Sequence, residues 1–159
     1  MKLYHGSNTA VKDPQILKSD RKLDFGTGFY LTSSFEQAER WAQHVSLRRG
    51  NGHPVISIYE FPDDFMTSLK VKFFPDADKE WLLFVVANRS GQTVDDGSDL
   101  IIGPVADDQT VQTITLFADG FLDVDAAIRK LKAQKLKDQF VIKSASALNL
   151  LQFKEFKQL

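Results

Sequence analysis

Two residues in the first part of the chain have side chains and glycine neighbours suited to holding a small molecule. His5 is followed at once by Gly6, whose backbone a ligand can approach closely. Tyr30 follows the glycine-rich loop 26–28, and the alternation of a strand places it on the opposite face from Phe29. One of these two aromatic side chains therefore belongs to the core, while the other is placed to face a cleft. Each motif also has a plainer interpretation, as a structural histidine and as a turn that leads into a core strand.

Several classes of chemistry are excluded by motifs that the sequence lacks. The chain has no cysteine, which removes disulfides, cysteine-ligated zinc and a cysteine nucleophile. It also lacks the glycine-rich dinucleotide fingerprint, the Walker loop, the HExxH zinc motif and the GxSxG serine motif. The three histidines, His5, His44 and His53, do not have metal-ligand spacing, so no metal site is expected.

Composition narrows the class of protein further. Lysine and arginine total 20 and aspartate and glutamate total 21, which argues against a protein that binds nucleic acid or a membrane surface by net charge alone. No stretch approaches the roughly 18 consecutive apolar residues of a membrane span, and the first residues lack the apolar segment of a signal peptide. We therefore expect a cytoplasmic protein. The 13 phenylalanines predict an aromatic core.

The elements that must position the candidate residues are short and mixed. The best-marked helix is 34–49, because Ser33 and Ser34 each stand three residues before a glutamate or glutamine, as in a capping box, and Gly50 is a natural stop. Further helices are expected at 78–88, 124–136 and 144–149. Strands are expected from Lys2, at 29–32, 54–61, 99–104 and 139–143, and through Phe153 and Phe156. Residues 107–117 fit either a helix or a strand.

The order of these elements predicts the fold class. No repeat or long linker divides the chain, so we expect a single domain over residues 1–159. Strands and helices do not alternate regularly. The pattern therefore favours an α+β fold with a mostly antiparallel sheet over a doubly wound parallel one.

Three motifs, taken in order, resemble a known superfamily. They are LYHGS at 3–7, DFGTGFYLT at 24–32, and Gln37-Ala38 followed by Trp41-Ala42. Together they look like the histidine–tyrosine branch of the ADP-ribosyltransferase superfamily, which includes diphtheria toxin and the poly(ADP-ribose) polymerases. The closer resemblance is to a family of small, toxin-like bacterial proteins, and it extends over almost the whole chain through blocks at 88–89, 99–108 and 139–143.

The resemblance implies a fold and a dinucleotide site. The fold is an α+β domain in which NAD+ lies across a split, mostly antiparallel sheet with flanking helices. His5 would hold the adenosine ribose, and the backbone of Gly6 would bind the nicotinamide carboxamide. Tyr30 would stack on the nicotinamide ring, because the face of an aromatic side chain is a sound platform for a cationic pyridinium. Ser7 and Gly28 belong to the same motifs and are expected among the dinucleotide-binding residues.

A third motif departs from the superfamily pattern. Gln139 stands where the superfamily often places a glutamate, whose carboxylate binds the ribose 2′-hydroxyl. Its amide can hydrogen-bond that hydroxyl but brings no charge, so we expect slow transfer of single ADP-ribose groups. Asp138 points the opposite way on a regular strand. Asp107 and Asp108 are alternative acids that also fit a helix cap, and residues 88–89 fit a solvated helix end better than a phosphate contact.

The expected activity is that of an NAD+-dependent mono-ADP-ribosyltransferase. Catalysis would rest on Tyr30 and Gln139, with NAD+ as co-substrate and an unknown protein or nucleic acid as acceptor. The toxin-like resemblance suggests a toxin–antitoxin or defence system with a neutralising protein partner. Two alternatives stay open: a relative with another reaction, such as an RNA 2′-phosphotransferase or an NAD glycohydrolase, and a degenerate module that binds ADP-ribose or a partner without catalysis.

Overall fold

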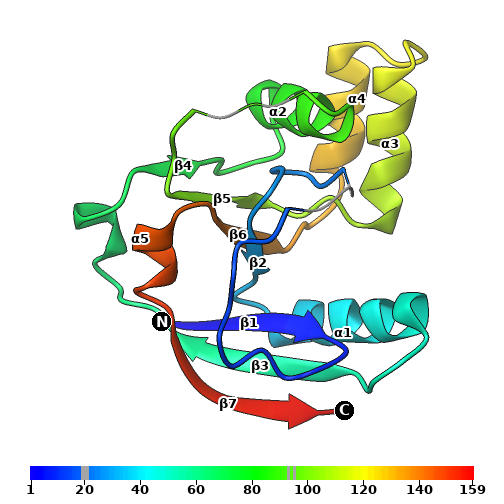
Figure 1. Ribbon diagram of the computed structural model, residues 1–159. Coiled ribbons are helices and arrows are strands. Elements are labelled where there is room, and N and C mark those ends of the chain that lie inside the picture. The colour runs from blue at the N-terminus through cyan, green and yellow to red at the C-terminus, as the bar shows by residue number, and fades with distance from the viewer. Residues whose placement is uncertain (19–21, 93, 95) are drawn as a thin grey trace.

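Two β-sheets form the centre of the protein (Figure 1). The computed structural model describes residues 1–18, 22–92, 94 and 96–159. The first sheet has the order β1-β3-β7, with strands β1 (Lys2–Ser7), β3 (Val55–Glu60) and β7 (Gln152–Gln158). The second has the order β2-β6-β5-β4, with strands β2 (Phe29–Leu31), β6 (Asp138–Ile142), β5 (Leu100–Pro104) and β4 (Val71–Phe73).

Neighbouring strands are antiparallel with one described exception. β4 runs parallel to β5, while the other pairs of both sheets are antiparallel. The prediction of an α+β fold with mostly antiparallel sheets is therefore confirmed. β4 was not predicted, because it is as short as β2 and has no glycine-rich loop in front of it to mark where it begins.

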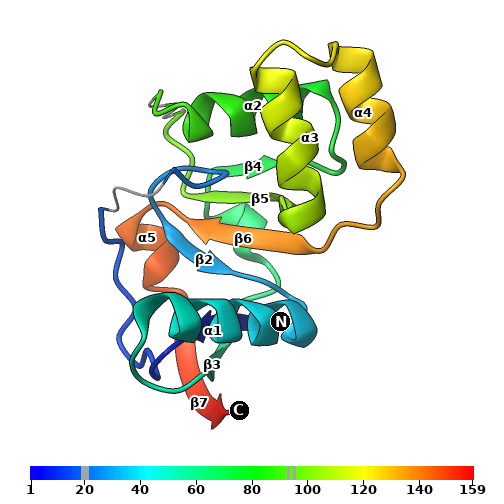
Figure 2. The same cartoon turned by 90° about the vertical axis from the view of Figure 1, so that its right-hand side faces the viewer.

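The helices cover the outer faces of the two sheets (Figure 2). α1 (Phe35–Arg49) packs on the outer face of β1 and β3. Three helices gather on the far side of the second sheet: α2 (Lys79–Arg89), α3 (Asp108–Ala118) and α4 (Val124–Lys132). Two short elements, the 3-10 turn η1 (Phe65–Thr67) and α5 (Ala145–Leu148), complete the described structure.

The predicted helix at 34–49 is confirmed together with its signals. The hydroxyl of Ser34 accepts a hydrogen bond from the Gln37 amide at 3.3 Å, so Ser34 caps the helix and α1 itself begins at Phe35. Gly50 ends the helix in the left-handed region, at φ 67°.

The ambiguous segment 107–117 forms a helix because of its cap. The Asp107 carboxylate accepts hydrogen bonds from the amides of Gln109 at 3.1 Å and Thr110 at 3.0 Å. This confirms the interpretation of Asp107 as a helix cap. The helix expected at 124–136 is shorter and ends at Lys132, since the chain must turn there to enter β6.

The two sheets meet at a bridge between β1 and the end of β2. The Tyr4 amide donates to the Thr32 carbonyl at 2.9 Å, and the Thr32 amide donates to the Tyr4 carbonyl at 3.0 Å. This is the one β-bridge between β1 and β2 in the described part of the chain. Beyond it the described residues of the two strands do not pair.

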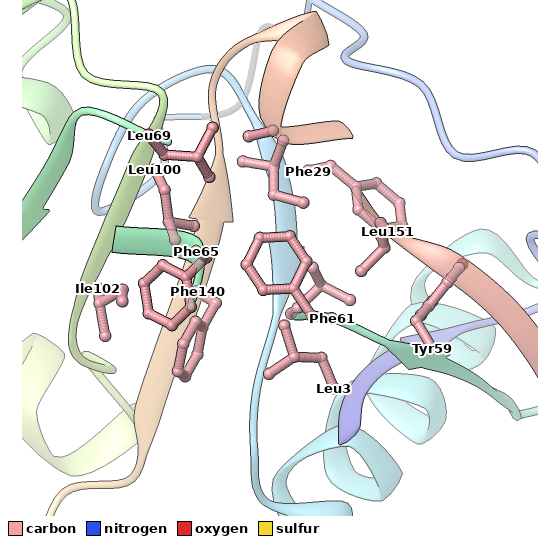
Figure 3. Packing of buried hydrophobic residues seen from close by; sticks show 13 residues of the cluster. Leu3, Phe29, Tyr59, Phe61, Phe65, Leu69, Leu100, Ile102, Phe140 and Leu151 are labelled. Atoms are coloured by element: carbon pink, nitrogen blue, oxygen red, sulfur yellow. The ribbon is translucent and has the colours of Figure 1, made fainter. Parts of the chain in front are cut away.

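The space between the sheets is filled by a hydrophobic cluster (Figure 3). Its aromatic members are Phe29, Tyr59, Phe61, Phe65 and Phe140. A second cluster lies under α2, α3 and α4 and adds further buried rings, namely Phe25, Phe74, Trp81 and Phe84. Seven of the 13 phenylalanines are buried, which confirms the aromatic core.

Candidate functional site

His5 connects β1 to β2 through its side chain. Its Nδ1 atom lies 2.8 Å from the carbonyl oxygen of Tyr30, and its ring stacks on Phe29 with 4.5 Å between ring centroids. A carbonyl oxygen only accepts hydrogen bonds, so Nδ1 carries the proton and Nε2 of the neutral ring is an acceptor. Burial lowers the pKa of His5 below its ordinary value, against the opposing effect of the Tyr30 carbonyl, so the ring is neutral at pH 7. None of the described residues hydrogen-bonds to Nε2.

Gly6 lies where β1 loses its neighbour on the β2 side. Tyr4 directs its amide and carbonyl to Thr32, and alternation directs those of Gly6 to the same edge, two residues beyond the bridge. Within the described ranges, the amide and carbonyl of Gly6 have no hydrogen-bond partner, although the residue is buried. Buried backbone groups are nearly always paired, so this edge is a candidate position for a ligand.

The packing of α1 on β1 also explains why residue 6 is a glycine. A Cβ atom there would lie 2.1 Å from the Ala38 carbonyl oxygen and 2.6 Å from the Ala42 amide nitrogen of α1. Gly6 is therefore required for the close packing of α1 on β1. Its neighbour Ser7 is buried, with its hydroxyl 3.5 Å from Asn8 Oδ1.

The hydroxyl of Tyr30 holds the loop that precedes β2. It accepts a hydrogen bond from the Phe25 amide at 3.1 Å and donates one to the Gly26 carbonyl at 2.7 Å. The ring is half-buried beside the cluster under α2–α4, on the opposite face of β2 from Phe29. Gly28 lets this loop pack closely, since a Cβ there would lie 2.5 Å from Val141 Cγ1.

Gln139 shares the face of Tyr30 but is directed into the protein. Tyr30 pairs with Val141, and Gln139 lies two residues from Val141 on β6, so the three side chains share one face. Gln139 is 2% exposed, and its Nε2 atom donates to Asp24 Oδ2 and to the Pro104 carbonyl, each at 3.0 Å.

Asp138 points elsewhere, as expected for its neighbour on a regular strand. Its carboxylate accepts hydrogen bonds from the Thr32 hydroxyl at 3.0 Å and the Ser33 amide at 2.9 Å, and it also contacts the Ser33 hydroxyl. The pairing of β6 with β5 continues through Asp138 and Gln139 without a shift of register. Asp138 therefore fixes the turn between β2 and α1.

A buried ion pair behind Gln139 was missed in the sequence. Asp24 is 6% exposed, and its Oδ1 atom accepts from Arg89 Nε at 2.7 Å and Arg89 Nη2 at 2.6 Å. The expectation that residues 88–89 form a solvated helix end is thus wrong, because Asn88 is also buried at 8% exposure. No local spacing signals a pair whose members stand 65 positions apart.

The predicted site residues therefore fall into two groups that meet at β2. Tyr30 and Gln139 lie on one face, and both hydrogen-bond to the segment 24–26. His5 lies against Phe29 on the other face and contacts Tyr30 through its backbone. In the described part of the chain, no group of three or more histidine or acidic side chains is placed to hold a metal ion, and no helix has the length and apolar character to cross a bilayer.

The fold and this site define an α+β protein of two mostly antiparallel sheets that meet at β1 and β2, with an unpaired backbone edge and a neutral histidine at the junction. The chain belongs to the family described as proteins of unknown function DUF3990, whose model matches residues 1–153. No curated protein and no solved structure matches it.

Proposed function

We propose that this protein is an NAD+-dependent mono-ADP-ribosyltransferase whose dinucleotide site lies where the pairing between β1 and β2 ends. The observation that carries the proposal is the backbone edge of Gly6, which has no partner among the described residues and directly follows a neutral His5 whose Nε2 is also without one. A carboxamide offers one donor and one acceptor side by side, which is what an unpaired amide and carbonyl of a strand require. NAD+ carries such a carboxamide on its nicotinamide ring.

The remaining residues fit the same ligand by their chemistry. Nε2 of His5 accepts a hydrogen bond from a ribose hydroxyl. The face of Tyr30 stabilises a cationic pyridinium, an interaction worth about 0.5–2 kcal/mol. Ser7 follows Gly6 at the end of β1, and Gly28 directly precedes β2. NAD+ acts as co-substrate, and the reaction proposed below requires no metal.

The reaction breaks the bond between the nicotinamide nitrogen and the ribose carbon. The electron pair of that bond leaves with neutral nicotinamide, and the ribose carbon passes through an oxocarbenium-like state. A nucleophilic atom of the acceptor then bonds to that carbon and loses its proton. The protein orients the ribose and stabilises the developing positive charge, for which the carbonyl oxygen of Gln139 is suited. Because Gln139 is uncharged, we propose slow transfer of single groups to a macromolecular acceptor.

Two measurements test this proposal. Calorimetric titration with a non-cleavable NAD+ analogue should show binding that His5→Ala abolishes and that His44→Ala, a substitution on the exposed side of α1, leaves unchanged. Release of nicotinamide from NAD+ should be measurable for the wild type and lost in Tyr30→Ala. A well-folded wild type that binds no analogue would overturn the proposal.

The structure also favours one second candidate, a module that binds ADP-ribose without catalysis. The observation behind it is the burial of Gln139, which is 2% exposed and engaged within the protein. A binder takes up ADP-ribose but releases no nicotinamide in either wild type or Tyr30→Ala. The toxin setting has its own test: strong expression of the wild type should deplete cellular NAD+ and slow growth, Tyr30→Ala should relieve both effects, and a neutralising protein should restore growth.

A further inference from the structure

The side-chain nitrogen of Gln139 has two hydrogen-bond partners among the described residues, and both are acceptors. Nε2 lies 3.0 Å from Asp24 Oδ2 and 3.0 Å from the Pro104 carbonyl oxygen. Neither an ionised carboxylate nor a carbonyl donates, so turning the amide over would set its oxygen against two oxygens. Both hydrogens of the Gln139 amide therefore bond to acceptors inside the protein, and Oε1 is the atom left to contact a ligand. None of the described residues donates to Oε1.

Asp24 is itself fixed by two other parts of the chain. Arg89, at the end of α2, donates to Oδ1 through Nε at 2.7 Å and Nη2 at 2.6 Å. The Ala106 amide, which follows β5, donates to Oδ2 at 3.0 Å. Gln139 Nε2 is the fourth donor, so each oxygen of this buried carboxylate accepts two hydrogen bonds. Its position and its polarity are both determined by the fold.

We propose that Asp24 and Arg89 form a positioning pair that locks the Gln139 amide, so that Gln139 presents only an acceptor oxygen to a ribose hydroxyl. This inference rests on the proposed function, since it assigns the ligand-facing atom of that site. A hydroxyl donor and a carbon that gains positive charge both require an electron-rich oxygen opposite them. The locked amide supplies this oxygen at a position where the carboxylate of an ionised glutamate would repel that of Asp24.

The obvious substitution therefore has an unusual expected effect. Gln139→Glu places carboxylate oxygens against Asp24 and the Pro104 carbonyl, where like charges repel and no hydrogen is available. When the new glutamate is protonated, its hydroxyl donates to Asp24 and its carbonyl stays an acceptor, as in the native glutamine. The double variant Asp24→Asn/Gln139→Glu removes the repulsion between two carboxylates and lets the new amide donate to the new carboxylate. The Ala106 amide and the Pro104 carbonyl still lose their present partners, so the recovery is partial.

The test is the steady-state rate of nicotinamide release from NAD+ in these variants across the range of about pH 5.5–8, where a raised carboxyl pKa is readable. Asp24→Asn and Gln139→Glu should each lower kcat by about ten- to a hundredfold at neutral pH, with a smaller change in KM. The double variant should recover part of the loss. Exposed substitutions of the same kind, Asp125→Asn on α4 and Gln43→Glu on α1, should leave kcat unchanged.

The pH profile separates positioning from a merely structural role. Among the described residues, Asp24 contacts Gln139 directly and Arg89 contacts Asp24 on its other oxygen. Lys143, just after β6, donates from Nζ to the Phe25 carbonyl at 2.6 Å, and Asp138 is turned to Thr32 and Ser33. The ratio of the Gln139→Glu rate to the wild-type rate should rise as the pH falls, and dividing by the wild type removes the titration of His5. A ratio independent of pH, or purely additive losses in the double variant, overturns the proposal.

Hydrogen exchange measured by NMR tests whether Asp24 holds the Gln139 amide, without any measurement of activity. The side-chain amide signal of Gln139, assigned by its loss in Gln139→Glu, should exchange slowly with solvent in the wild type and quickly in Asp24→Asn. Arg89→Lys, which keeps the charge but not the two-pronged contact, serves if Asp24→Asn does not fold. Fast exchange in the wild type refutes the lock. Slow exchange in a protein that neither binds nor cleaves NAD+ refutes the ligand-facing role together with the proposed function, and leaves the pair as a structural feature.

Discussion

The Nδ1 atom of His5 and the carbonyl oxygen of Tyr30, 2.8 Å apart, join β1 to β2 beyond the point where their backbones stop pairing. This contact fixes which nitrogen of the ring carries the proton, because the carbonyl accepts only. Nε2 consequently keeps its lone pair as long as the ring is neutral. The contact thus couples the protonation state of one side chain to the geometry of the junction between the sheets.

The first prediction concerns stability at mildly acidic pH. Burial lowers the pKa of His5 in the folded protein below its unfolded value near 6.5, so the unfolded chain binds a proton more readily. The free energy of unfolding should therefore fall as the pH drops from 6.5 toward the lowered folded pKa, and this contribution is fully present above pH 6.5. Urea unfolding of wild type and His5→Gln between pH 5 and 8 should show a difference in stability that changes in this window. Equal pH slopes for the two proteins would contradict the assignment.

The second prediction isolates the hydroxyl of Tyr30. Tyr30→Phe keeps the ring but removes the two hydrogen bonds to Phe25 and Gly26, and it should destabilise the protein by about 1–2 kcal/mol. Tyr4→Phe is the matched control, since no hydrogen bond to the Tyr4 hydroxyl occurs among the described residues. Urea titrations at constant pH measure both. A loss in Tyr4→Phe as large as in Tyr30→Phe would show that the loop contacts are not responsible.

The third prediction tests why Gly6 lacks a side chain. Gly6→Ala would place Cβ against backbone atoms of α1 at 2.1 and 2.6 Å, which a rotamer change cannot relieve. We expect destabilisation of about 3 kcal/mol or more, typical of overpacking against backbone. Gly50→Ala is the comparison: its Cβ meets no atom of the described residues within 4 Å, and its positive φ should cost only about 1–2 kcal/mol. A Gly6→Ala protein as stable as wild type would mean that α1 can move away from β1.

Local signals in the sequence predicted most of the elements. The capping serine and terminal glycine of α1 act within a few residues, so Ser34 and Gly50 identified that helix correctly. The same holds for Asp107, whose capping role was recognised although the segment after it was ambiguous. β4 and the parallel pairing with β5 depend on a partner far along the chain, and no glycine-rich loop precedes this short strand to mark where it begins.

The site was predicted less completely, for a related physical reason. The positions of His5 and Tyr30 on strands follow from their motifs. The contact between them uses a backbone carbonyl oxygen, which every residue has, so the residue types do not predict it. The environment of Gln139 is set by Asp24 and Arg89, residues that precede β2 and end α2. Long-range polar pairs of this kind arise from the packing of elements and leave no periodic trace in the sequence.

The fourth prediction concerns that pair directly. The side chains of Asp24 and Arg89 are 7% and 29% exposed. Arg89→Met would leave the buried carboxylate with the Ala106 amide and Gln139 as its donors in the described part of the chain. Breaking a buried pair from one side costs about 3–5 kcal/mol, and the partial exposure of Arg89 favours the lower end of that range. Arg40→Met on α1 removes a solvent-exposed pair with Glu36 at 3.4 Å and should cost less than about 0.5 kcal/mol. Thermal and urea unfolding of both variants give the comparison. Similar small losses in both would show that Asp24 is solvated in solution, and the network around Gln139 would then lack the rigidity that its hydrogen bonds imply.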